Sequence, residues 1–141
     1  LHDLLENIVE SVKLKVENVG GNLSCQLAAT NPVVRADKLH LTNIFHNLLD
    51  NAIKYCNGAP QITVSTADQG AKGILLKIED KGIGIAKEHQ SKVFKKFYRV
   101  PTGNVHNVKG FGLGLFYIKN VCKAHGWRLQ LESEPGLGTT I

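Results

Sequence analysis

The side chains in this sequence with the most evident chemical potential lie on one predicted helix, between Asp37 and Tyr55. Apolar residues recur there at helical spacing, and the opposite side is rich in amides. That side carries Asn43, Asn47, Asp50, Asn51 and Lys54. Residues three and four apart share a helix face, so these groups are expected to project together. Amide oxygens can coordinate a hard cation such as Mg²⁺, and lysine can meet phosphate. A solvated face is the common alternative, but asparagine is a poor helix former.

A second candidate is Asp80, followed by Gly82 and Gly84 in the pattern D-x-G-x-G. A carboxylate at the end of a strand can accept a hydrogen bond from an exocyclic amine. The two glycines allow the backbone to approach a flat ring closely. A simple strand-ending turn explains the pattern equally well.

A third candidate is the glycine-rich segment from Lys109 to Leu115, where a long loop meets a predicted helix. Glycines before a helix present free backbone N–H groups and the positive end of the helix dipole, which suits phosphates. The spacing matches neither the P-loop nor the dinucleotide-binding pattern. A flexible turn is the competing interpretation.

The elements that must position these groups can be traced along the chain by periodicity. Helices are predicted over residues 3–17, 37–55, 88–97 and 112–125. Strands are predicted at Leu23–Leu27, Val33–Val34, Ile62–Val64, Leu76–Ile78, Leu129–Leu131 and Thr139–Ile141, with hairpin turns at Asp68–Gly70 and Pro135–Gly136. Residues 98–111 form a long loop, which in a compact domain is usually functional. Hairpins interleaved with helices predict an α+β fold, an open mixed sheet with helices on one face.

The bulk properties fit one soluble globular domain spanning residues 1–141. Apolar residues make up 43% and charged residues 21%, and no apolar run is long enough to cross a bilayer. The net charge of +5 comes from dispersed residues and does not by itself select a partner. Three cysteines without metal-like spacing indicate a reducing, cytosolic setting. The chain has no methionine, which suggests an excised piece of a longer protein.

Five motifs in series carry a family resemblance. They are Asn47–Tyr55, Asp80-x-Gly82-x-Gly84, Phe94–Arg99, Gly110-x-Gly112-x-Gly114-Leu115 and Gly136-x-Gly138-Thr139. In order and spacing they resemble the N, G1, F, G2 and G3 boxes of the catalytic, ATP-binding domain of sensor histidine kinases. The resemblance runs from about Val34 to the last residue. It implies the two-layer α/β sandwich, or Bergerat fold, of the GHKL superfamily, with a mostly antiparallel mixed sheet and a mobile ATP lid at about 98–111.

The resemblance also implies roles for individual residues. Asn51 matches the asparagine that ligates Mg²⁺, and Asp80 matches the aspartate that reads the adenine amino group. Arg99 resembles an arginine that approaches the γ-phosphate. With Asn47, Asn51 and Lys54 it forms the expected catalytic set. The expected nucleotide contacts are Asn47, Asn51, Lys54, Tyr55, Asp80, Gly82, Gly84, Ile85, Lys109, Gly110, Phe111, Gly112, Leu113, Gly114, Leu115 and Thr139. Phe94 and Phe97 look like lid anchors, or are ordinary core residues.

Position 47 separates branches of this superfamily. The gyrase-like hydrolases and the anti-sigma serine kinases typically have glutamate there, which can act as a general base, whereas this chain has Asn47. A neutral imidazole is already a nucleophile, so a domain that phosphorylates histidine can do without that base. Asp50 is a nearby carboxylate that leaves this inference open.

The resemblance therefore implies a protein-histidine kinase domain that uses ATP and Mg²⁺ and donates the γ-phosphoryl group to another domain. In the family, the acceptor lies on a dimeric helical hairpin, and the product passes to a response regulator. None of the six histidines has the acceptor context, so the chain alone is not expected to autophosphorylate. We expect a cytoplasmic location, as part of a membrane-anchored sensor, with no nucleic-acid or direct membrane contact. A degenerate domain that only binds nucleotide and a gyrase-type ATPase are the alternatives.

Overall fold

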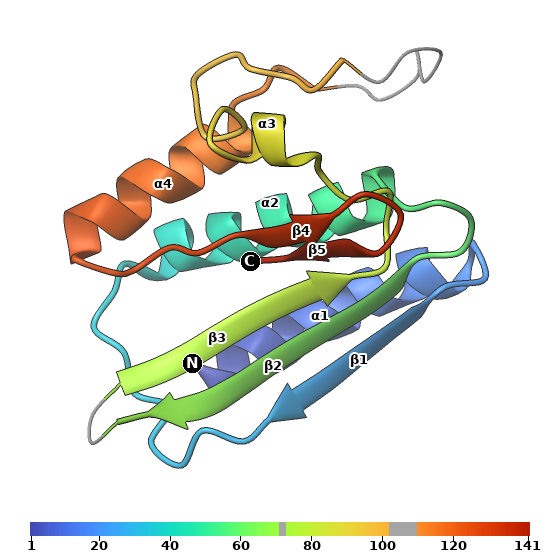
Figure 1. Ribbon diagram of the computed structural model, residues 1–141. Helices are drawn as coiled ribbons and strands as arrows, with labels where there is room; N and C mark the ends of the chain where they lie inside the picture. The colour runs from blue at the N-terminus through green and yellow to red at the C-terminus, as the bar shows by residue number, and fades with distance from the viewer. Residues whose placement is uncertain (71–72, 102–109) are drawn as a thin grey trace.

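A computed structural model describes residues 1–70, 73–101 and 110–141. It contains helices α1 (His2–Glu17), α2 (Lys38–Lys54), α3 (Lys87–Gln90) and α4 (Gly114–His125). Its strands are β1 (Asn22–Leu27), β2 (Gln61–Gln69), β3 (Gly73–Asp80), β4 (Glu132–Glu134) and β5 (Gly138–Thr140). Figure 1 shows the strands as one layer, with α1 and α2 behind them, and α4 lies beside α2.

The sheet has the order β1-β2-β3-β5-β4. β1 runs parallel to β2, because the α2 segment between them acts as a crossover, and the other neighbouring pairs are antiparallel. The predicted mixed, mostly antiparallel sheet with helices on one face is therefore confirmed.

One core joins the two layers. It combines one stripe of each long helix with the inner residues of the strands. Fully buried members include Leu5 and Val16 of α1, Phe45 of α2, Val64 of β2 and Ile118 of α4. Burial of each such side chain contributes roughly 1.5–3 kcal/mol, so the core holds the inner face of α2 firmly. The polar face of that helix lies outside the core.

Helix α2 begins where the sequence predicts. Asp37 is the N-cap, and its carboxylate accepts a hydrogen bond of 3.0 Å from the His40 backbone N–H. That bond lowers the pKa of Asp37. The helix ends with the Tyr55 backbone N–H bonded to the Asn51 carbonyl.

Four predicted elements differ in the structure. Val33–Val34 forms no strand, since Val33 is 81% exposed and pairs with none of the described strands. The predicted helix 88–97 is the four-residue α3 followed by turns, and the Phe97 N–H bonds instead to the Gly112 carbonyl.

The hairpin turn was predicted to include Asp68 and Gln69, but both residues belong to strand β2, where they lie opposite Ile74 and Gly73. The strand expected at Leu129–Leu131 starts only at Glu132, because β5 offers three residues to pair with.

Candidate functional site

A cavity of about 330 Å³ opens between the polar face of α2 and the strands β3 and β5. From α2 it is lined by Asn47, Asn51 and Lys54, with Tyr55 just past the helix end. The loop after β3 contributes Gly84 and Ile85, and Asp80, Ile78, Thr139 and Ile141 come from or directly follow the sheet. Segment 98–100 and residues Gly110 to Leu115 form another part of the wall, and Leu48, Ile83 and Val93 complete it.

The predicted site residues are therefore brought together, with two exceptions. Gly82 does not line the cavity, and Lys109 lies outside the described residues, as does most of the expected lid. Gly82 instead contacts Asp80, which does line the cavity. Its N–H donates a 2.8 Å hydrogen bond to Asp80 Oδ1. A side chain there would lie 2.5 Å from the Tyr55 carbonyl oxygen, so only glycine lets the loop approach the end of α2.

Asp80 is fixed by contacts on both sides. Its backbone is opposite Thr139 in the β3–β5 ladder, and the next residues bond to the end of α2 through the Ile83 N–H and the Tyr55 carbonyl, 2.9 Å apart. Burial raises the pKa of the Asp80 carboxyl, and hydrogen bonds from the Gly82 and Thr139 N–H groups offset part of that rise. A half-buried carboxylate with this environment suits a ligand that donates hydrogen bonds.

The three asparagines on the polar face of α2 do not all face the cavity. Asn47 and Asn51 face the cavity, and the Asn47 amide nitrogen donates 2.7 Å to the Asn43 carbonyl. Asn43 itself points its side chain toward the Tyr117 hydroxyl of α4, at 3.5 Å, and does not line the cavity. The expectation that the whole stripe acts together is wrong for Asn43.

Asp50 also turns away from the cavity. Its carboxylate pairs with Lys15 on α1 at 3.0 Å, on the outer side of α2. Among the described residues that line the cavity, Asp80 is the one carboxylate, and it sits at the sheet end. Asp50 is therefore not placed as a base for a nucleophile bound beside Asn47 and Asn51.

The described residues that line the cavity do not supply a complete set of protein ligands for a divalent cation. In the described part of the chain, no group of three or more His, Cys, Asp or Glu residues could hold a metal. Asn51 is half-buried and lines the cavity, so its amide oxygen could supply one ligand. Mg²⁺ typically takes one or two protein oxygens and completes its shell with phosphates and water, which this arrangement fits.

The glycine-rich segment meets α2 at the start of α4. A side chain on Gly114 would lie 2.7 Å from Asn47 Oδ1, so glycine allows this helix end to approach the Asn47 amide. Gly112 has a left-handed φ of +68°. Phe111 is 85% exposed at the cavity mouth. Phe97 is exposed and has a φ of +63°, and Phe94 is half-buried, so neither is an ordinary core residue.

Gly112 and Gly110 give the first testable contrast. A side chain on Gly112 would lie 2.7 Å from the Tyr98 carbonyl oxygen, whereas one on Gly110 meets no described atom within 4 Å. Gly112→Ala is therefore expected to cost about 1–3 kcal/mol of folding free energy, and Gly110→Ala far less. Urea unfolding of both variants measures this. Equally small losses of folding free energy in both variants would show that the loop relaxes freely at both positions, which would contradict this expectation.

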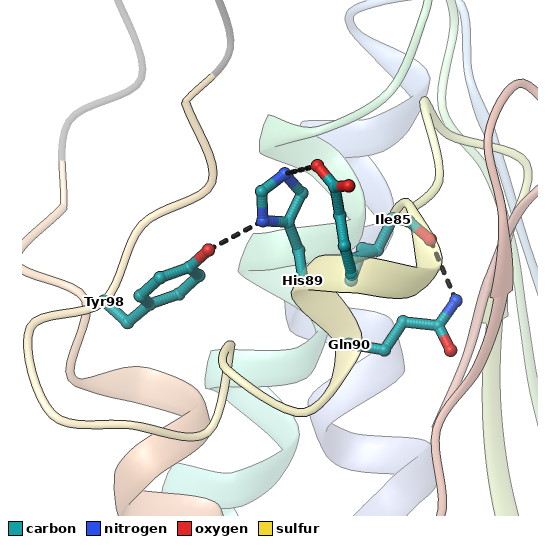
Figure 2. Close-up of polar contacts among 5 residues, drawn as sticks. Ile85, His89, Gln90 and Tyr98 are labelled. Carbon is teal, nitrogen blue, oxygen red and sulfur yellow. Dashed lines mark hydrogen bonds and ion pairs between the residues drawn. The ribbon is translucent and has the colours of Figure 1, made fainter.

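Two residues that contact the cavity wall, Ser133 and Gln90, have no recognisable motif in the sequence. Ser133 Oγ accepts a 2.8 Å hydrogen bond from the Ile85 N–H and approaches Thr139 Oγ1 at 2.8 Å. Gln90 Nε2 donates to the Ile85 carbonyl (Figure 2) and to the Ser133 carbonyl. These contacts join residues up to 48 positions apart, which no local pattern could have indicated.

The fold and the site together define an ATP-binding domain of the α/β sandwich type. Residues 36–141 match the family model described as "Histidine kinase-, DNA gyrase B-, and HSP90-like ATPase", and the chain belongs to that family. The similarity to the catalytic and ATP-binding domain of sensor histidine kinases is confirmed.

Individual relatives agree with this assignment. The chain is 44% identical over 139 residues to the sensor protein RprX of Bacteroides fragilis, covering 98% of the chain and 27% of the relative. The chain thus spans about a quarter of that protein. Its fold matches full-length ShkA, solved in complex with AMPPNP, with a TM-score of 0.84 at 22% identity over 98% of this chain and 28% of ShkA. It also matches the histidine kinase ThkA in complex with the response regulator TrrA, with a TM-score of 0.76 at 18% identity over 99% and 38% of the two chains.

Among the described helices, none combines the length and apolarity that a membrane crossing requires.

Proposed function

We propose that this domain binds Mg²⁺-ATP and transfers the γ-phosphoryl group to a histidine on another domain of the same parent protein. The observation that carries the proposal is the composition of one cavity. Asp80 stands at the end of β3, Asn47, Asn51 and Lys54 line the α2 wall, and Arg99 also lines the cavity. This separation suits a ligand with a purine at one end and a polyphosphate at the other.

Each residue then has a distinct task. Asp80 accepts the hydrogen bond of the adenine amino group, and Gly84 and Ile85 lie beside the ring. The amide of Asn51 would hold Mg²⁺, which when bound neutralises phosphate charge. Asn47, Lys54 and Arg99 position the phosphates, with Gly114 at the start of α4 nearby. Such transfers depend on positioning and charge neutralisation.

The arrangement favours histidine over water or serine as the acceptor. A hydroxyl nucleophile needs a base, but position 47 has an amide and Asp50 is paired with Lys15. A neutral imidazole nitrogen attacks phosphorus with its own lone pair, as the bond to the β-phosphate oxygen breaks and ADP departs. The acceptor would lie on a dimeric helical hairpin, and a response regulator would receive the phosphoryl group next. In this proposal the domain is the cytoplasmic part of a membrane-anchored sensor.

The test supplies the acceptor in trans. The chain is incubated with the hairpin domain of its parent protein and ATP labelled at the γ-phosphate. Acid-labile, base-stable phosphate on the hairpin is the expected result, with none on the chain incubated alone. Nucleotide binding without labelled hairpin would favour a domain that uses ATP only as a structural ligand. Steady phosphate release by the chain alone would favour a gyrase-type hydrolase.

A further inference from the structure

A short path of hydrogen bonds runs through α3 from Ile85 to Tyr98 (Figure 2). Both of these residues line the cavity, and Tyr98 stands at the start of the loop 98–111. At its first end, the Gln90 side-chain amide donates to the Ile85 carbonyl at 2.9 Å and to the Ser133 carbonyl at 2.8 Å. These two bonds attach α3 to the loop after β3 and to β4. The four-residue helix is thereby held in place by one strand of the sheet and by the loop that follows another.

At the other end of the path, His89 contacts Tyr98. The distance from His89 Nδ1 to the Tyr98 hydroxyl is 2.7 Å, and His89 Nε2 lies 3.2 Å from a Glu88 carboxylate oxygen. A carboxylate only accepts, so the neutral ring carries its hydrogen on Nε2, and Nδ1 accepts from the tyrosine O–H. The His89 side chain is 17% exposed, so water competes weakly for this bond.

Tyr98 belongs to the stem from which Arg99 extends. Tyr98 and Arg99 both line the cavity. The residue before them, Phe97, has a left-handed φ of +63°, which is costly for a side chain with a β-carbon. Its N–H bonds to the Gly112 carbonyl at 3.0 Å, so the residues that flank the loop 98–111 meet here. A strained backbone of this kind persists only where surrounding contacts hold it.

We propose that His89 is a positioning residue for phosphoryl transfer. Its hydrogen bond to Tyr98 fixes the stem so that Arg99 reaches the terminal phosphate. This inference rests on the function proposed above. His89 itself does not line the cavity and acts through Tyr98 and Arg99. The path through Gln90 and Ile85 links this stem to the part of the cavity that holds the base.

The variants are chosen to separate the hydrogen bond from the fold. Tyr98→Phe removes only the hydroxyl, and His89→Leu removes both ring nitrogens. His89→Asn keeps a polar atom near the position of Nδ1 and serves as the rescue variant. In the full-length parent protein, Tyr98→Phe and His89→Leu should each slow phosphoryl transfer at saturating ATP by about 10-fold, because small misplacements of a catalytic group are costly. ATP affinity should change less than about twofold, and His89→Asn should restore most of the rate.

Arg99 provides the decisive comparison. In an Arg99→Ala background, His89→Leu should slow transfer by less than about twofold more, because the two residues act in one path. A full, independent effect in that background would overturn the proposal, as would a His89→Leu variant with the wild-type rate or with weaker ATP binding alone.

Hydrogen–deuterium exchange on the ligand-free domain gives a readout that does not depend on transfer. The amides of Tyr98, Arg99 and Val100 should exchange faster in His89→Leu and Tyr98→Phe than in the wild type. Unchanged exchange would reject the positioning role even if the kinase function holds. If exchange is faster in both variants but the wild-type protein transfers no phosphate, the His89–Tyr98 bond still orders segment 98–100, and it is the proposed function that is rejected.

Discussion

Replacing Asp80 by asparagine is expected to weaken ATP binding by about 10-fold or more and, at neutral pH, to make the ligand-free domain more stable. The loss of affinity follows because an amide that keeps its oxygen on the Gly82 N–H turns hydrogen-bond donors toward the adenine amino group. The gain in stability follows because a half-buried charge is removed, while the backbone contact can remain.

The same substitution should alter base preference. Inosine triphosphate carries a carbonyl where ATP carries the amino group, so it should bind the wild type weakly and Asp80→Asn better. The matched control is Glu79→Gln, since Glu79 is the neighbouring carboxylate on β3 but lines a separate hollow with Thr63 and Lys81. Isothermal titration with both nucleotides measures the effect. Equal affinity of wild type and Asp80→Asn for ATP would remove Asp80 from the base site.

The pH dependence has a definite sign. The folded-state pKa of Asp80 is raised above the ordinary value of 3.8. A group of this kind contributes stability below its unfolded pKa, and that contribution is lost as pH rises through the folded pKa. The stability advantage of Asp80→Asn should therefore be largest at neutral pH and vanish below about pH 3.8. Binding to the wild type should also weaken as the carboxylate is protonated.

Asn51→Ala is expected to produce the second large effect. The loss of the amide that would hold Mg²⁺ should cost about 1–3 kcal/mol of nucleotide affinity, which corresponds to roughly 5- to 150-fold. The magnesium dependence of binding should largely disappear with it. A fluorescent ATP analogue titrated with and without Mg²⁺ measures both quantities.

Asp50→Ala is the natural control for that experiment. It removes a polar side chain one position away on the same helix, but one that pairs with the exposed Lys15 outside the cavity. Surface pairs of this kind contribute little, so both stability and ATP affinity should stay close to wild type. An affinity loss in Asp50→Ala equal to that in Asn51→Ala would contradict the assignment of the metal position.

The sequence was most informative where a strong local signal coincided with the final structure. The apolar stripe and the Asp37 N-cap located α2 to within one residue at each end. Helical spacing alone therefore placed Asn47, Asn51 and Lys54 on one face. The order of the five motifs then identified the family. The resemblance predicted that Asp80 and Thr139 contact the same nucleotide, and both residues line one cavity.

Prediction failed where pairing depended on distant residues. Nothing near Leu129 shows that its segment lacks a strand partner, and nothing near Asn43 shows that it faces Tyr117. The missed path through His89 and Gln90 has the same origin. Single polar residues in a short helix have no distinctive local pattern, and their role comes from contacts with Tyr98, Ile85 and Ser133.

The most direct test is an amide-resolved NMR titration of the ¹⁵N-labelled domain with Mg²⁺-ATP. We expect saturable shifts concentrated at Asn51, Gly84, Gly114 and Thr139, from four different segments that meet at one cavity. The open face of β1 and β2 around Thr63 should remain unchanged. Shifts gathered on that open face, or no shift at saturating nucleotide, would contradict the central claim that this cavity binds ATP.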